Sequence, residues 1–117
     1  MTINERDAGY LWDMVQAINR IQEFTQDLSY DDYLASHLVQ SGVERKLEIL
    51  GEAAGRISTE LRQAHPSIDW QGTVGLRNII IHRYNDVKAD TIWRIVSSQL
   101  APMKEKLEAL LPPTQAE

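Results

Sequence analysis

Hydrophobic residues recur every three or four positions along most of the chain, which is the spacing of one face of an α-helix. Proline and glycine are sparse within these stretches. Each stripe needs a neighbour to cover it, so the pattern predicts an all-α, up-and-down bundle of four to five helices. The three clearest stripes are Leu11, Met14, Ile18, Ile21, Thr25 and Leu28; Val43, Leu47, Leu50, Ala54, Ile57, Leu61 and Ala64; and Trp93, Val96, Leu100, Met103, Leu107 and Leu110.

Caps and helix breakers divide these stripes into separate elements. The residue before a proline resists helical angles, and a proline inside a helix removes one hydrogen bond. The expected elements are a short turn of helix capped by Ser29, a long second helix ending at His65-Pro66-Ser67, a third helix from Asp69 or Trp70 to about His82, a turn at Asn85-Asp86, a fourth helix starting between Lys88 and Asp90, and a kink near residues 98–101 caused by Pro102.

The length of 117 residues and the lack of a repeat or linker predict a single helical domain over 1–117, with a loose tail over 112–117. The absence of cysteine excludes disulfides, cysteine-ligated zinc and thiol nucleophiles. The polar N-terminus and the lack of an apolar run of roughly 20 residues predict a cytoplasmic protein with no membrane partner.

The formal net charge of −5, from 12 basic and 17 acidic residues, counts against bulk attraction to nucleic acid. Proteins that bind nucleic acid usually carry a basic face, because neutralised phosphates supply most non-specific affinity. Any contact with RNA is therefore expected to be local, within a cleft that concentrates positive charge.

Two glycine pairs lie inside predicted helices, Gly51 with Gly55 and Gly72 with Gly75. Each costs about 1 kcal/mol relative to alanine in a helix. Two interpretations stay open: close approach of two helix backbones, or sequence drift on an exposed face. The three tryptophans are expected to fill the core; they are Trp12, Trp70 and Trp93.

The third predicted helix is apolar on both sides, as in a helix packed between layers or into an interface. Arg77 lies within its broader apolar arc, and Ile79 points the opposite way. A guanidinium in such a place must satisfy five N–H donors, which requires acidic side chains or phosphate groups beside it. Glu52 is either the partner of Arg77 or simply a solvated residue.

Arg77 and His82 are five residues apart, roughly 140° around an ideal helix, so they converge poorly on one phosphate. Either the helix end turns His82 inward, or two copies meet across a twofold axis. The second arrangement is attractive because an apolar helix with glycines can be self-complementary, which predicts a homodimer. Asn78 and His82 are four apart, so the amide could orient the imidazole.

These residue types suit cleavage of RNA without a metal or other cofactor. A histidine with a pKa of about 6.5 can take a proton from a 2′-hydroxyl or give one to the leaving oxygen, and an arginine can grip the phosphate. No two histidines have i, i+4 spacing, so no metal site is predicted. The spacing alone also fits a structural role, in which Arg and His offset a helix dipole and Tyr84 packs on the core.

Three segments followed by Trp93 resemble the HepT-like branch of the HEPN superfamily, and the resemblance covers nearly the whole chain. Its most specific part is the pattern Arg-Asn-x3-His-x-Tyr. The segments are Leu47-Glu48-Ile49-Leu50-Gly51-Glu52-Ala53-Ala54, His65-Pro66-Ser67-Ile68-Asp69-Trp70 and Leu76-Arg77-Asn78-Ile79-Ile80-Ile81-His82-Arg83-Tyr84.

The resemblance implies a helical bundle that dimerises through the motif-bearing third helix and acts as a metal-independent endoribonuclease toxin. It implies that Arg77 and His82 are catalytic, with Asn78, Tyr84 and Glu52 in support. It also implies a partner, an MNT-type nucleotidyltransferase antitoxin that silences the toxin by transferring AMP from ATP to Tyr84.

One position departs from the family pattern, because relatives often carry an acidic residue where this chain has Arg83. That arginine could add affinity for RNA phosphate or alter the approach of the antitoxin. Two other functions stay open: a non-catalytic accessory subunit that binds a nucleotidyltransferase and presents nucleotide or substrate to it, and a purely structural helical dimer.

Overall fold

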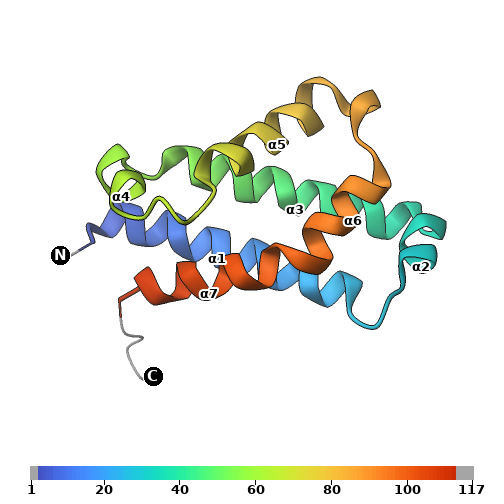
Figure 1. Cartoon of the computed structure of the whole chain (residues 1–117), viewed down its shortest axis with the longest axis horizontal. Helices are drawn as coiled ribbons and strands as arrows, with labels where there is room; N and C mark the ends of the chain where they lie inside the picture. Colours follow the sequence, from blue (N-terminus) through green and yellow to red (C-terminus); the bar gives the residue numbers. More distant parts are fainter. Residues whose placement is uncertain (1–2, 113–117) are drawn as a thin grey trace.

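A computed structural model describes residues 3–112, and nearly all of its ordered elements are helical (Figure 1). Within that range the chain forms seven α-helices and one 3-10 turn and no strand, which confirms the all-α prediction. The elements are α1 (Glu5–Thr25), α2 (Tyr30–Ala35), α3 (His37–Arg56), α4 (Thr59–Ala64), α5 (Trp70–His82), the 3-10 turn η1 (Tyr84–Asp86), α6 (Ala89–Ser98) and α7 (Leu100–Leu110).

The long helices run up and down beside one another. In Figure 1, α1 and α3 form the centre of the molecule, α7 packs on α1, and α5 lies on the opposite side of α3. Five helices have ten residues or more, in agreement with the predicted four to five. The additional two, α2 and α4, have six residues each.

The predicted apolar stripes form the core. Burial of each large aliphatic side chain contributes roughly 1.5–3 kcal/mol, so these stripes hold the helices together. Ala64, the last member of the second stripe, is exposed. The buried members are Leu11, Met14, Ile18 and Ile21 on α1; Val43, Leu47, Leu50 and Ala54 on α3, with Ile57 and Leu61 beyond it; and Leu100 and Leu107 on α7.

The prediction that all three tryptophans fill the core is wrong for Trp12, whose exposed fraction is 53%. Trp12 follows Leu11, which is fully buried, so it projects about 100° around α1 from the core-facing stripe. Trp70 is buried, and Trp93 is half-buried with its ring centroid 5.3 Å from that of Tyr33.

The predicted long second helix is in fact two helices, because the chain breaks at residues 57–58. Ser58 caps α4 by accepting a hydrogen bond from the Leu61 N–H. Its own N–H and hydroxyl donate to the buried carboxylate of Asp7, at 2.9 and 2.6 Å. A backbone N–H committed to a side chain on α1 cannot continue the helical ladder, so the helix ends there.

The remaining predicted boundaries agree with the structure. Ser29 and Asp32 form a reciprocal capping box at the start of α2. α4 stops at the residue before His65-Pro66, and the break between α6 and α7 falls at Gln99, three residues before Pro102. Apart from Pro112, the predicted tail lies outside the described residues.

No helix in the described part of the chain is both long enough and apolar enough to span a lipid bilayer.

Candidate functional site

Arg77 is placed by an unusually close approach of α5 to α3. A Cβ atom at Gly51 of α3 would overlap the Cβ of Arg77 and would lie 2.9 Å from the backbone oxygen of Thr73. The missing side chain therefore lets the stem of Arg77 cross directly over the α3 backbone. Of the two interpretations of the glycines, close approach holds at Gly51, whereas Gly55 makes only an ordinary contact with Val74.

The guanidinium of Arg77 is held from two sides at the edge of this contact. Its Nη2 lies 3.0 Å from Oε1 of Glu52, and its Nη1 donates to Oδ1 of Asn78 at 3.1 Å. Its Nε is buried and has no hydrogen-bond partner within residues 3–112. The terminal nitrogens carry four N–H groups in all, so two have no partner within the described residues and can donate to a ligand.

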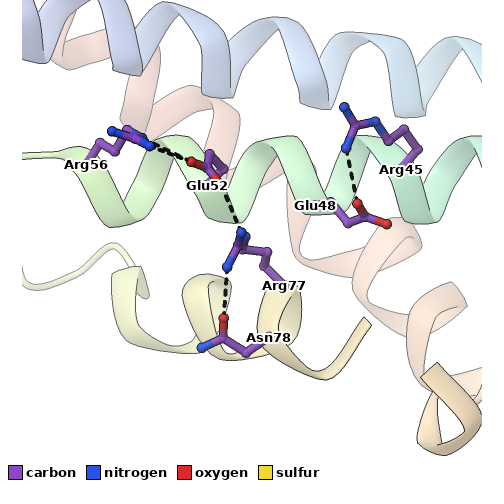
Figure 2. Close-up of polar contacts among 6 residues, drawn as sticks. All are labelled: Arg45, Glu48, Glu52, Arg56, Arg77 and Asn78. Carbon is purple, nitrogen blue, oxygen red and sulfur yellow. Dashed lines mark hydrogen bonds and ion pairs between the residues drawn. The ribbon is translucent and has the colours of Figure 1, made fainter. Parts of the chain in front are cut away.

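Figure 2 shows that Glu52 joins two arginines on different helices. Its Oε2 accepts from Nε and Nη2 of Arg56 at 3.0 and 2.9 Å, while its Oε1 faces Arg77. The hydrogen bonds from Arg56, followed by the positive charge of Arg77, lower the pKa of Glu52 below its ordinary value of 4.5. Glu52 is thus both a partner of Arg77 and solvent-accessible, with 44% of its side chain exposed.

Arg56 was not among the residues predicted for the site. Its only sequence signal is the i, i+4 spacing from Glu52, which is common on helix surfaces and does not indicate function. The cluster of Arg56, Glu52 and Arg77 has a net charge of about +1. Positive charge is therefore concentrated locally in a chain whose net charge is −5.

His82 lies in the last turn of α5, and its side chain is exposed. The imidazole is therefore not turned into the protein interior, as the first of the two predicted arrangements expects, and its convergence with Arg77 stays a prediction. Asn78 makes its hydrogen bond with Arg77, and none joins it to His82 although both side chains are described. The amide positions the arginine rather than the imidazole.

The residues that follow His82 are open to solvent. Tyr84 begins the 3-10 turn with an exposed fraction of 69%, so it does not pack on the core. Arg83 makes an exposed ion pair with Asp86 at 3.0 Å. Such pairs are weak and exchange readily, so Arg83 remains accessible to a ligand.

The outward face of α5 is not covered by another helix within residues 3–112. α5 packs mainly on α3. Ile79, which points away from the arc that holds Arg77, keeps 38% of its surface exposed, and a Cβ at Gly75 would meet no atom within 4 Å. Within residues 3–112 the helix is therefore not packed between two layers, and the interface through its second side stays a prediction.

Two hollows near Arg77 share Gly55 and Val74 in their linings. The smaller has a volume of about 240 Å³ and lies over Gly51, Glu52, Arg56 and Arg77. The larger, about 1030 Å³, runs between α4 and the first half of α5 and reaches Asn78. A phosphodiester bound at Arg77 would have room on at least one side for the flanking nucleotide.

Comparison with known proteins decides the family. Residues 14–110 match the family described as ribonuclease HepT-like. The chain belongs to this family. The match covers α3, α5 and the motif between Arg77 and Tyr84, and it confirms the assignment to the ribonucleases that the resemblance implied.

Two relatives of the HepT-like chain align over most of their length. A protein named probable ribonuclease HepT from Thermococcus cleftensis is 36% identical over 101 residues, which are 86% of this chain and 92% of the relative. A protein of Methanocaldococcus jannaschii, named as a candidate RNase, is 34% identical over 107 residues, 91% of this chain and 98% of the relative. No solved structure gives a significant match.

Proposed function

We propose that this HepT-like protein is a metal-independent endoribonuclease toxin in which Arg77 binds the scissile phosphate and His82 transfers protons. The supporting observation is the placement of Arg77, which is fixed by Glu52 and Asn78 and still presents free N–H groups beside a hollow. The 2′-oxygen attacks phosphorus as its proton leaves, the P–O5′ bond breaks, and the 5′-oxygen receives a proton. His82 serves one of these two proton transfers, and Arg77 stabilises the charge on the phosphoryl oxygens.

We propose further that the active unit is a homodimer. On one α5, Arg77 and His82 point about 140° apart and cannot both face one phosphate. A twofold axis through the uncovered face of α5 would bring Arg77 of one protomer toward His82 of the other. Ile79 supplies an apolar contact of the kind that such an interface needs.

Single substitutions test the catalytic assignment. His82→Ala and Arg77→Ala should each reduce cleavage of a fluorescent RNA by at least about 100-fold, the usual size of an acid–base or charge-stabilising contribution. The matched control is His37→Ala, since His37 is also exposed but lies at the start of α3. If His82→Ala cleaves RNA and arrests growth like the wild type, His82 is not catalytic.

A mixture of the two inactive variants tests whether each site is shared between protomers. In a heterodimer of His82→Ala and Arg77→Ala, one composite site is intact and the other lacks both groups. Random mixing makes half of the dimers mixed, so about a quarter of the wild-type activity should return. A mixture as inactive as its components would contradict the shared site.

The oligomeric state can be measured directly by sedimentation. Ile79→Asp should shift the protein toward monomer, because it places a charge in the apolar interface. The control Leu38→Asp introduces the same charge at a residue that is 84% exposed on another surface. If Ile79→Asp leaves the sedimenting mass unchanged, the dimer does not form through this face of α5.

We also propose that a nucleotidyltransferase antitoxin silences the enzyme by attaching AMP to Tyr84. Tyr84 is exposed and lies two residues from His82, so AMP there would put bulk and negative charge where RNA phosphate binds. Incubation with the cognate transferase and ATP should add AMP to the wild type but not to Tyr84→Phe, as measured by intact-protein mass spectrometry. Equal modification of both proteins would exclude Tyr84, and Tyr30→Phe is the control.

A further inference from the structure

The polar contacts around Glu52 divide its two oxygens between two arginines. Both bonds from Arg56 go to Oε2, at 3.0 and 2.9 Å, and the ion pair with Arg77 uses Oε1 at 3.0 Å (Figure 2). The second terminal nitrogen of Arg77 contacts Asn78 instead of Glu52. Arg77 is therefore held by one carboxylate oxygen only.

A carboxylate with both oxygens free binds a guanidinium through two parallel hydrogen bonds, in the geometry that a phosphate also uses. Glu52 is thus a potential competitor of the RNA phosphate for Arg77. In the structure both N–H groups of the Arg56 fork occupy Oε2, and only Oε1 faces Arg77.

We propose that Arg56 is a positioning residue for RNA cleavage, which acts by restraining Glu52 so that Arg77 is oriented but remains open to the phosphate. This inference rests on the proposed ribonuclease function. Without Arg56, Glu52 engages Arg77 through both oxygens and masks it. RNA must then displace Glu52, so the apparent affinity for RNA equals the intrinsic affinity multiplied by the fraction of molecules in which Arg77 is not masked.

A double-substitution cycle separates this role from others. Arg56→Gln should raise KM for RNA about tenfold and weaken binding of an RNA with a 2′-deoxy cleavage site by the same factor, while saturating RNA restores kcat to within about twofold. Glu52→Gln combined with Arg56→Gln removes the competitor. The double variant should bind RNA more tightly than Arg56→Gln alone, and its KM for RNA should lie within about threefold of the KM of Glu52→Gln.

Two further variants complete the design. Arg56→Lys keeps a cation on Oε2 and should retain most of the affinity. Arg45→Gln is the matched control. Arg45 makes a comparable ion pair at 3.1 Å with Glu48 along the same helix, and Glu48, unlike Glu52, makes no ion pair with Arg77. This variant loses the same charge and should leave KM within about twofold of the wild type.

Each result has a defined meaning. If the double variant binds RNA as weakly as Arg56→Gln, then Arg56 contacts RNA itself and the positioning role is overturned. If Arg45→Gln weakens binding as much as Arg56→Gln, only the overall charge matters, which also overturns it. If Arg56→Gln lowers kcat and the thermal midpoint together, its role is structural.

The wild-type protein in the same assays tests the proposed function separately. If the wild type neither cleaves RNA nor binds the 2′-deoxy analogue, the ribonuclease proposal fails and this inference fails with it. If the wild type does both and the cycle lacks the expected rescue, only the role of Arg56 is wrong.

Discussion

The close approach of α5 to α3 at Gly51 makes a substitution to alanine unusually informative. Alanine is normally the better helix former, by about 1 kcal/mol. At Gly51, however, the added Cβ would overlap the Cβ of Arg77 and stand 2.9 Å from the oxygen of Thr73, whereas ordinary contact begins at 3.4 Å. Both neighbours belong to the α5 backbone or to its first side-chain atom, so no rotamer change relieves the clash.

The helix must therefore move by at least about 0.5 Å, and the side chain of Arg77 moves with it. Overpacking of this kind costs about 1–3 kcal/mol, against the gain of about 1 from helix propensity. We expect Gly51→Ala to lose up to about 2 kcal/mol of unfolding free energy, a fall of up to about 8 °C in Tm. RNA cleavage should fall as well, since Arg77 leaves its position between Glu52 and Asn78.

The matched control is Gly9→Ala in the second turn of α1, where a Cβ would meet nothing within 4 Å. It should gain about 0.5–1 kcal/mol and keep full activity. In urea unfolding the free energy of unfolding should therefore fall for Gly51→Ala and rise for Gly9→Ala, and RNA cleavage should fall for Gly51→Ala alone. A Gly51→Ala protein that is stabilised as much as Gly9→Ala, with unchanged cleavage, would refute it.

Three further predictions concern stability. Asp7→Ala should cost about 2–3 kcal/mol in urea unfolding, because it leaves the N–H and hydroxyl of Ser58 without their buried acceptor, whereas the exposed Asp13→Ala should cost little; equal effects would contradict this role. Burial raises the pKa of Tyr33, whose hydroxyl has no hydrogen-bond partner within residues 3–112. In thermal unfolding Tyr33→Phe should therefore be neutral or stabilising by about 1 kcal/mol. A marked loss of stability would mean that the hydroxyl is hydrogen-bonded. Because the pKa of Glu52 is lowered in the fold, its ionised form stabilises the protein above pH 4.5, and this contribution disappears as the pH falls through the folded-state pKa. The difference in unfolding free energy between wild type and Glu52→Gln should therefore shrink below pH 4.5. A difference that grows there would mean that the ionised carboxylate does not stabilise the fold.

The helices and most of their ends could be predicted because their causes are local. Apolar spacing on α1, α3 and α7, the Ser29 cap and the breaks at Pro66 and Pro102 depend on residues within a turn or two of each other. The break at residues 57–58 could not be predicted, because its cause is Asp7, fifty-one residues earlier in the chain. The exposure of Trp12 depends likewise on which neighbours cover α1.

Arg77, Asn78 and Glu52 could be named from the sequence, whereas Arg56 and the geometry of the candidate site could not. The sequence by itself determined the helical bundle, the chemistry of an arginine and a histidine on one helix, and the angle of about 140° that separates them, because helix geometry follows from local spacing. Only the tertiary structure decided that Gly51 brings Arg77 against α3, that Glu52 divides its oxygens between Arg56 and Arg77, and that the outward face of α5 stays uncovered. The physical reason is that a guanidinium is oriented by whichever acceptors the packing of two helices places beside it, and that packing is a property of the whole fold.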